Sequence, residues 1–212
     1  MFLLDVDNTL LDNDRVIEDL RAHFATNFGD ELEQHYWEVF EQLREELGYA
    51  DYLGALQRFR AAYPHETKLV EMSLWLVDYP FADRLYPGAL EVVERLGQFG
   101  LPVVLTDGDV VFQPRKVERA GIRRAVGGRV LIYVHKELEL DDVERSYPAG
   151  RYVLIDDKLR ILAAVKEVWG EQVTTVFPRQ GHYALDPEAL ASYPRADVEI
   201  DRIADLLTLD LG

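Results

Sequence analysis

Short apolar runs alternate with helical patterns along most of the chain. Six runs are rich in apolar and β-branched residues and are continuous rather than alternating, which is typical of strands covered on both faces. They are FLLD at 2–5, PVVLT at 102–106, RVLIYV at 129–134, YVLID at 152–156, VTTV at 173–176 and DVEI at 197–200. Helical spacing of apolar residues lies between them, as over 88–99 (Leu90, Val93, Leu96 and Phe99, with Gly100 as a stop), 112–120 and 158–168. This alternation predicts an α/β fold with a doubly wound, mainly parallel sheet.

The stretch from 14 to 84 interrupts this alternation. It is rich in Leu, Glu, Gln, Arg and aromatic residues, and its spacing predicts helices near 15–28, 31–47, 51–62 and 66–78. One of these helices carries an apolar stripe, for which packing between helices is the leading interpretation and substrate contact the alternative. The stripe consists of Tyr36, Trp37, Phe40, Leu43 and Leu47. We therefore expect a core domain of residues 1–13 and 85–212 and an inserted helical cap domain of residues 14–84.

Charge and composition exclude several classes of function. The chain has 212 residues with 39 acidic and 23 basic side chains, which gives a formal net charge of −16. Such a surface repels nucleic acid and an anionic membrane, so neither is expected as a partner. The sequence has no cysteine, no apolar run long enough for a membrane span and no signal-peptide pattern, which together favour a cytoplasmic location. A phosphorylated substrate would need a local metal ion, lysine or helix N-terminus.

Chemically reactive residues follow four of the predicted strands. Parallel sheets bind ligands at the carboxyl ends of their strands, so these residues are expected to meet at one edge. The strand ends carry Asp5-Val6-Asp7-Asn8-Thr9, Thr106-Asp107-Gly108, His135-Lys136 and Asp156-Asp157.

Asp5 and Asp7 form the most informative pair. Two close carboxylates repel each other unless a cation lies between them or one keeps a proton. Either solution serves catalysis, because a cation can keep Asp5 ionised as a nucleophile while Asp7 acts as a general acid. A calcium loop of the EF-hand type is disfavoured, since its Gly and Glu positions are occupied by Leu10 and Val16. A strand-end turn with purely structural aspartates is the remaining alternative.

Taken together, these strand ends resemble the motifs of the haloacid dehalogenase (HAD) superfamily. DVDNT at 5–9 is similar to its first motif, D-x-D-x-[TV]. Thr106 resembles the Ser or Thr of the second motif, Lys136 the lysine of the third, and Asp156-Asp157 the acidic fourth. The order and spacing fit nearly the whole chain, and the stretch at 14–84 lies where the family inserts its C1-type helical cap. The resemblance implies a HAD-like Rossmannoid core.

The resemblance also implies roles for these residues. Asp5 would attack phosphorus to form an aspartyl-phosphate, and Asp7 would protonate the leaving alkoxide and then activate water. Mg²⁺ would be held by the Asp5 carboxylate, the Asp7 backbone carbonyl and the Asp156-Asp157 pair, with Asp157 preferred as the direct ligand and Asp156 as a partner of the lysine. Thr106, helped by the backbone N–H groups of Asp107 and Gly108, would bind phosphoryl oxygens. Lys136 would contact phosphate and nucleophile, with Lys116 as its rival.

The resemblance favours a phosphatase acting on a small phosphorylated metabolite. Family members that release halide lack an acid–base residue at the position of Asp7, and Thr9 is more typical of phosphatases than of phosphomutases. A phosphomutase, a dehalogenase and a catalytically idle binding protein remain as alternatives. Sugar phosphates, nucleotides and phosphoglycolate-like acids all stay open as substrates. The oligomeric state is open as well. His182 could lie at the edge of the pocket, and Arg179 could contact an anionic substrate.

Overall fold

A six-stranded parallel sheet forms the centre of the molecule. In the computed structural model, which describes residues 1–209, all six strands predicted from the apolar runs are present. They are β1 (Phe2–Leu4), β2 (Pro102–Asp107), β3 (Val130–Tyr133), β4 (Tyr152–Ile155), β5 (Val173–Pro178) and β6 (Val198–Ile200). Their order across the sheet is β3-β2-β1-β4-β5-β6, and every neighbouring pair is parallel. The predicted doubly wound α/β fold is confirmed.

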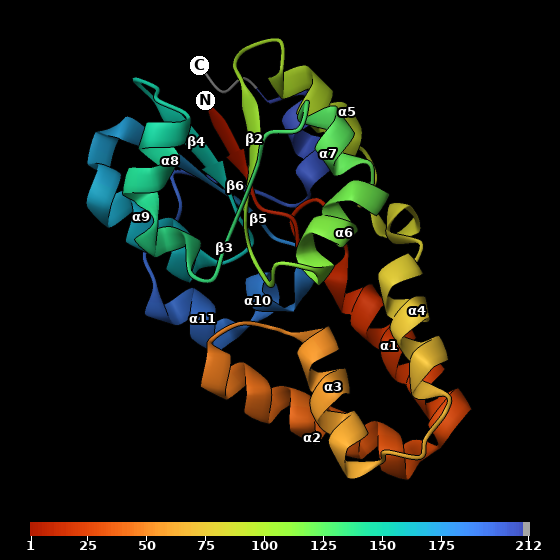
Figure 1. Cartoon of the computed structure of the whole chain (residues 1–212). Coiled ribbons are helices and arrows are strands. Elements are labelled where there is room, and N and C mark those ends of the chain that lie inside the picture. The colour runs from red at the N-terminus through yellow and green to blue at the C-terminus, as the bar shows by residue number, and fades with distance from the viewer. Residues whose placement is uncertain (210–212) are drawn as a thin grey trace.

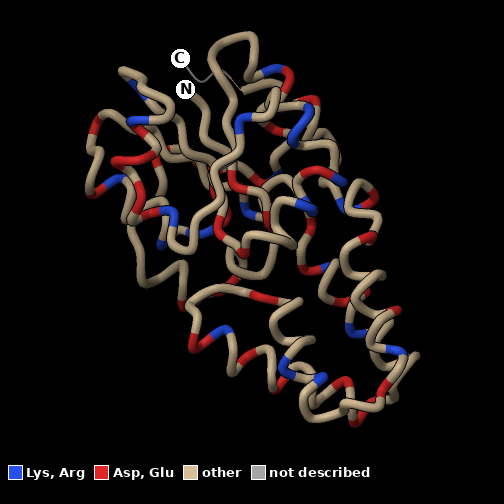
Figure 2. Tube along the Cα trace, in the orientation of Figure 1, with Lys and Arg blue, Asp and Glu red and all other residues tan. Residues whose placement is uncertain are grey.

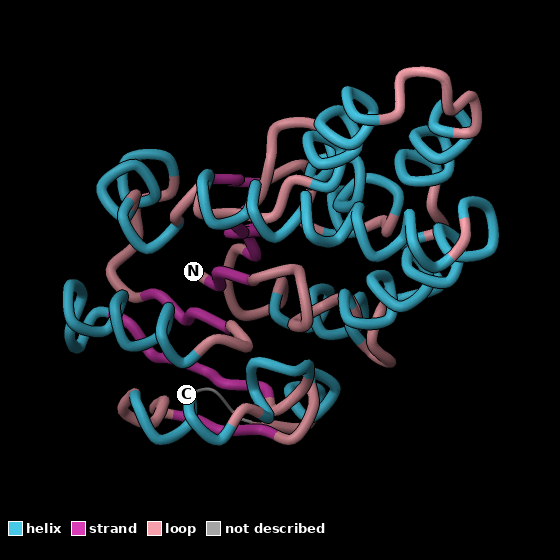
Figure 3. Tube along the Cα trace, turned by 90° about the horizontal axis from the view of Figure 1, so that it is seen from below, coloured by secondary structure: helices cyan, strands magenta, loops and turns pink. Residues whose placement is uncertain are grey.

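Helices cover both faces of the sheet (Figures 1 and 3). Side chains of each central strand alternate between two apolar clusters, so that Leu4 and Val104 belong to one cluster and Leu3 and Val103 to the other. The first cluster also contains α5 (Ala89–Leu96), α6 (Phe112–Arg119), α7 (Ile122–Ala125) and the 3₁₀ turn Ile203–Leu207. The second contains α8 (Leu140–Ser146) and α9 (Leu159–Trp169). Burial on both faces explains why the strands are continuous apolar runs.

Four helices lie between β1 and α5, and we call them the helical insertion. They are α1 (Asn13–Phe28), α2 (Asp30–Leu47), α3 (Tyr52–Ala62) and α4 (Leu69–Asp78). Aromatic rings hold the insertion together: Phe24 stacks on Tyr36 at 4.7 Å between ring centroids, and Phe40 stacks on Tyr52 at 4.8 Å. In Figure 1, α2 and α3 lie beyond the sheet, while α1 and α4 connect them to it. Two shorter helices, α10 (Gly181–Leu185) and α11 (Pro187–Ser192), follow β5.

Two details of the expected apolar stripes are wrong. Leu47 is 37% exposed, because it lies in the last turn of α2 before Gly48 ends that helix. Phe99 is 68% exposed, since α5 already ends at Leu96 and Phe99 lies outside it. The other residues named in the stripe of α2, from Tyr36 to Leu43, are buried as expected. Over residues 1–209, no helix combines the length and the apolar character that crossing a membrane requires.

Candidate active site

The candidate site lies where the winding of the sheet changes direction. From β1 the chain runs outward through β2 to β3, and it then returns to place β4 on the other side of β1. Connections on the two sides leave the sheet in opposite directions, which opens a crevice at the carboxyl ends of β1 and β4. Asp5 directly follows β1, and Asp156 and Asp157 directly follow β4. One carboxylate oxygen from each of the three lies within 4.8 Å of the other two.

Lys136 joins two of these carboxylates. Its ammonium group is 2.5 Å from Asp5 Oδ1 and 2.6 Å from Asp156 Oδ2, and it also donates to the carbonyl oxygen of Leu105 at 3.3 Å. The lysine is fully buried, and Asp5 is only 3% exposed. Although burial opposes the charged form, the carboxylates of Asp156 and Asp5 raise the pKa of Lys136 overall. The third strand end thus supplies a fixed positive charge next to the candidate nucleophile.

Within residues 1–209, the side chain of Asp157 has no hydrogen-bond partner. Both carboxylate oxygens are buried, and within residues 1–209 neither accepts a hydrogen bond. Burial raises the pKa of Asp157 well above its ordinary value and raises the pKa of Asp156 to about 6. A buried carboxylate without a partner is costly, and a divalent cation is the ordinary way to compensate for it. The all-oxygen ligand set suits a hard cation.

Two threonines and a glutamine connect the strand ends. Thr9 Oγ1 donates to Asp5 Oδ2 at 3.3 Å and accepts a hydrogen bond from the Asp157 N–H at 3.1 Å, so it links Asp5 to the acidic doublet. Thr106 is buried at the end of β2, and its Oγ1 accepts a hydrogen bond from Gln113 Nε2 at 3.1 Å. Gln113 was not predicted from the sequence, because a polar residue in the first turn of a helix carries no signal by itself.

Asp7 faces a different set of partners from Asp5. Its two carboxylate oxygens lie 2.7 and 2.9 Å from Lys116 Nζ, and Gln113 Nε2 donates to Oδ2 at 3.4 Å. Lys116 is buried and also donates to Asn13 Oδ1 at 2.9 Å. The side chain of Asp7 is 27% exposed. Both lysines considered for the phosphate therefore lie at the site, Lys136 against Asp5 and Lys116 against Asp7.

Asp107 and Gly108 lie beside the site, but one expected contact is not possible. The Gly108 N–H donates to the carbonyl of Tyr133 at 2.9 Å, which continues the pairing of β2 with β3. It is therefore not free to bind a phosphoryl oxygen, contrary to expectation. Asp107 Oδ1 accepts a hydrogen bond from the Lys136 backbone N–H at 2.8 Å, and burial raises the pKa of Asp107. Asp107 thus positions the backbone of the buried lysine.

The turn after Asp7 is braced from the C-terminal part of the chain. Asn8 has a left-handed backbone with φ of 58°, which Asn tolerates better than most residues. Gln180 Nε2 donates to the carbonyls of Asn8 and Thr9 at 3.2 and 2.8 Å, and Gln180 Oε1 accepts from the Ile203 N–H at 2.8 Å. One buried amide therefore fixes two turn carbonyls and a third segment at once.

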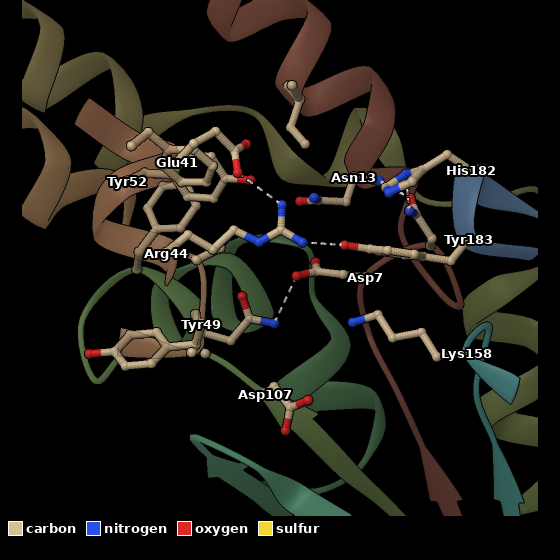
Figure 4. Close-up of a pocket in the computed structure, with 18 of the residues that line it drawn as sticks. Asp7, Asn13, Glu41, Arg44, Tyr49, Tyr52, Asp107, Lys158, His182 and Tyr183 are labelled. Carbon is tan, nitrogen blue, oxygen red and sulfur yellow. Dashed lines mark hydrogen bonds and ion pairs between the residues drawn. The ribbon is translucent and has the colours of Figure 1, made fainter. Parts of the chain in front are cut away.

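A cavity of about 520 Å³ adjoins the carboxylate cluster, with Asp7 in its wall. The insertion contributes Arg44, whose Nη2 donates to Tyr183 Oη of α10 at 2.7 Å. Lys158, directly after the acidic doublet, lies with its ammonium 4.9 Å from the centre of the Tyr183 ring. Figure 4 shows these side chains around one space. Arg44, Lys158 and Tyr183 were not predicted, because they come from distant segments and share no spacing pattern.

His182 and Arg179 occupy different environments. His182 lines the cavity, and its Nδ1 lies 2.5 Å from Asp14 Oδ1. Burial raises the pKa of Asp14, but hydrogen bonds from His182 and Asn8 lower it overall. Arg179 pairs with Glu199 and is not among the cavity residues.

A parallel sheet of this order with a carboxylate and lysine cluster at its switch point is the arrangement of a hydrolase of the HAD type. The family model described as haloacid dehalogenase-like hydrolase matches residues 1–140. A solved structure from Burkholderia xenovorans LB400, assigned as a haloacid dehalogenase-like hydrolase, is 61% identical with a TM-score of 0.93, and the match covers 99% of this chain and 97% of that one. The chain therefore belongs to the haloacid dehalogenase-like hydrolases.

More distant solved structures share the fold. The HAD-hydrolase YfnB from Bacillus subtilis, solved bound to magnesium, is 16% identical with a TM-score of 0.61 over 97% of this chain and 95% of that one. L-2-haloacid dehalogenase from Xanthobacter autotrophicus, with chloropropionic acid covalently bound, is 15% identical with a TM-score of 0.59 over the same shares. A comparison with curated proteins finds no match.

Proposed function

We propose that this protein is a Mg²⁺-dependent phosphatase that hydrolyses a small phosphate monoester through an aspartyl-phosphate on Asp5. The observation that carries the proposal is the convergence of Asp5, Asp156 and Asp157 to within 4.8 Å, together with the two carboxylate oxygens of Asp157, which have no hydrogen-bond partner in the described part of the chain. Three buried carboxylates with one lysine between two of them leave net negative charge that a divalent cation would balance.

The donor set fits magnesium. Asp157 and Asp5 would hold the ion through carboxylate oxygens, with the Asp7 carbonyl as a further oxygen ligand, while Asp156 stays engaged by Lys136. Magnesium prefers oxygen ligands and retains water, and the chain contains no cysteine that would favour a softer metal. When bound, the ion would neutralise charge on the phosphoryl oxygens.

The protein residues divide the remaining chemistry among themselves. The Asp5 carboxylate attacks phosphorus, and Lys136 keeps that carboxylate oriented through the 2.5 Å contact. The P–O bond to the leaving group breaks, and Asp7 gives the leaving oxygen a proton. Asp7 then takes a proton from the water that attacks the aspartyl-phosphate, which releases phosphate and restores Asp5. The hydroxyl group of Thr106 would donate a hydrogen bond to a phosphoryl oxygen.

The helical insertion would act as the cap of this enzyme. It supplies Arg44 to the wall of the cavity, and it reaches the core beside the site through Gly48, whose added Cβ would meet His135 Nε2 at 2.9 Å. Such a cover excludes water during turnover and reads the leaving group. The cavity volume of about 520 Å³ is of the size of a small-metabolite site.

Hydrolysis of para-nitrophenyl phosphate tests the proposal. We expect turnover with Mg²⁺, its loss in EDTA, and its restoration when Mg²⁺ is returned. Asp5→Asn should lower kcat by about 10³-fold or more, because an amide cannot form the phosphoenzyme. The matched control is Asp83→Asn, an exposed aspartate outside the site, which should keep full activity.

Assays with other substrates separate the alternatives. Chloride release from 2-chloropropionate without phosphate release would identify a dehalogenase, a reaction that needs no residue in the role of Asp7. Phosphate transfer to a second sugar hydroxyl would identify a phosphomutase. An absence of turnover across a broad set of phosphate esters would overturn the proposal in favour of a binding protein.

A further inference from the structure

The cavity wall has a charge balance opposite to that of the whole chain. Acidic residues outnumber basic ones by 39 to 23 in the sequence, and red segments recur along the entire trace in Figure 2. The basic residues that line the cavity are Arg21, Arg44, Lys116, Lys158 and Arg160. The acidic ones are Asp7, Glu41 and Asp107. This reversal focuses positive potential where a substrate would lie.

Most of these basic groups are already occupied by a carboxylate. Arg21 pairs with Glu33 at 2.8 Å, Arg160 with Glu137 at 2.5 Å, and Lys116 with Asp7 at 2.7 Å. These contacts neutralise the three charges locally. Among the basic residues of the cavity wall, Arg44 and Lys158 are then the two that could bind an anionic group of a ligand.

Arg44 and Lys158 are incompletely engaged. Arg44 contacts Glu41 at 3.4 Å on a half-exposed side, and its other terminal nitrogen donates only to a neutral hydroxyl, that of Tyr183. Lys158 lies against the face of the Tyr183 ring, and among residues 1–209 no carboxylate is within salt-bridge distance of it, although burial is outweighed by the nearby carboxylates of Asp157 and Asp5, which raise its pKa. Charged donors bind anionic oxygens more strongly than neutral ones, so both groups would gain from an anionic partner.

The two cations lie on the leaving-group side of the site. In Figure 4, Arg44 comes from the insertion, Lys158 comes from the segment after β4, and both side chains point toward the space beside Asp7. Asp7 is the residue that the proposed function assigns to the leaving oxygen. A group attached to that oxygen would therefore reach Arg44 and Lys158 within a few bonds.

We infer that the substrate carries a second anionic group on its leaving-group side, bound by Arg44 and Lys158. This inference rests on the proposed function and narrows its substrate class to phosphate esters with a carboxylate or a second phosphate. The hydroxyl of Tyr183 occupies one donor of Arg44 until the anion replaces it. Aromatic residues of the wall, among them Trp37 and Tyr52, provide the apolar surface for the part of the leaving group between the two anionic ends.

Binding of matched ligands tests the inference without relying on turnover. The ligands are 4-carboxyphenyl phosphate, its methyl ester, and 1,4-phenylene bisphosphate, with Kd measured by calorimetry on the Asp5→Asn variant in Mg²⁺. The acid and the ester share shape and phosphate and differ in one charge. We expect the acid or the bisphosphate to bind at least about tenfold more tightly than the ester, as a charge-assisted hydrogen bond would give. Which of the two prevails identifies the anion as carboxylate or phosphate.

Three further substitutions in the same background assign the effect. Arg44→Met should reduce the preference for the anionic ligand to below about threefold. Arg58→Met, an exposed arginine of α3 that pairs with Glu46, should leave it unchanged. Tyr183→Phe removes the hydroxyl contact of Arg44 but keeps both cations, and it should retain the preference. A loss in Tyr183→Phe equal to that in Arg44→Met would mean that Arg44 only anchors α10, and would overturn the inference.

The outcomes for the two proposals are separable. Equal Kd values for acid, ester and bisphosphate would overturn the inference, while Mg²⁺-dependent hydrolysis of all three by the unmodified protein would leave the phosphatase standing. Tight and Arg44-dependent binding of an anionic ligand without hydrolysis by the unmodified protein would support the anion subsite and overturn the phosphatase.

Discussion

The floor and the wall of the site are built in different ways. We call Asp5, Lys136, Asp156 and Asp157 the floor of the site. These residues are buried, and they lie in the segments that follow the carboxyl ends of β1, β3 and β4. The wall, represented by Arg44, Lys158 and Tyr183, comes from the insertion, the segment after β4 and α10, and it faces a cavity. In the floor, the charges of Asp5, Asp156 and Lys136 depend on one another, since removal of one leaves a buried charge unpaired. In the wall, Arg44 contacts Glu41 at 3.4 Å and the hydroxyl of Tyr183 at 2.7 Å, and Lys158 packs against the Tyr183 ring.

This difference suggests a division of labour, in which the floor carries out the chemical step and the wall recognises the substrate. A rigid, desolvated floor suits chemistry that every substrate shares, because its charges act in a low dielectric. A wall with spare hydrogen-bond donors suits recognition of what differs between substrates. The substitutions described next test the floor, then the metal ligand that we propose for it, and finally the fit of the insertion over the site.

Removal of the buried lysine should have the largest effect on stability. Lys136→Met leaves Asp5 and Asp156 without their shared counterion, and breaking a buried pair costs about 3–5 kcal/mol of unfolding free energy. Urea unfolding in EDTA measures the loss. Lys68→Met, at an exposed position, is the control and should lose under about 1 kcal/mol. Equal losses in the two variants would show that the floor is not a coupled unit.

Asp157→Asn should act in the opposite direction. The pKa of Asp157 is raised in the folded protein, so the folded state loses stability as the pH rises from about 4 toward that raised pKa. Without metal, the substitution should therefore stabilise the protein by about 1–3 kcal/mol at pH 8, and this gain should vanish near pH 4. Differential scanning calorimetry in EDTA follows both trends.

The same variant tests the metal site. Mg²⁺ should raise the Tm of the unmodified protein and leave that of Asp157→Asn unchanged, because a ligand stabilises only the state that binds it. A destabilised variant in EDTA at pH 8, or an undiminished response to Mg²⁺, would show that Asp157 has a structural role instead.

Gly48→Ala should change activity least of these substitutions. It should act on the position of the wall and leave the floor unchanged. Gly48 ends α2 with a φ of 80°, where alanine costs about 1 kcal/mol, and the added Cβ would lie 2.9 Å from His135 Nε2. Gly128→Ala is the matched control, since its φ is 82° and its Cβ would meet no atom within 4 Å. Both should lose similar stability by urea unfolding, but only Gly48→Ala should lower kcat/KM, by several-fold. Equal kcat/KM values would mean that this contact does not position the insertion.

The sequence was sufficient for the fold and for where the floor residues lie. Continuous apolar runs identified all six strands, because the central strands are buried on both faces and the edge strands β3 and β6 are partly buried. The floor residues were found because Asp5, Asp156 and Asp157 directly follow strands and Lys136 lies three residues after the end of β3, so one rule brings them together. Their catalytic roles stay predictions. The start of α4 was less visible: it begins at Leu69 rather than near 66, after a turn in which the Glu66 N–H donates to the Tyr63 carbonyl.

The wall could not be predicted in the same way. Arg44 meets Tyr183 across 139 positions of sequence, and this contact depends on how α2 is laid over the sheet. The Gly108 N–H failed as a phosphate donor for a related reason: whether a strand-end amide is free depends on how far β3 extends beside β2. Both properties depend on packing between elements, which no local pattern encodes.

The amide of Gln180 has a practical consequence for protein engineering. It holds the carbonyls of Asn8 and Thr9, although it lies beyond the region that the family model matches. A chimera that joins the first 140 residues to the C-terminal part of another hydrolase would expose these carbonyls without a donor unless the new part brings an equivalent side chain. The turn at Asn8 and Thr9 and residue 180 should therefore be exchanged together.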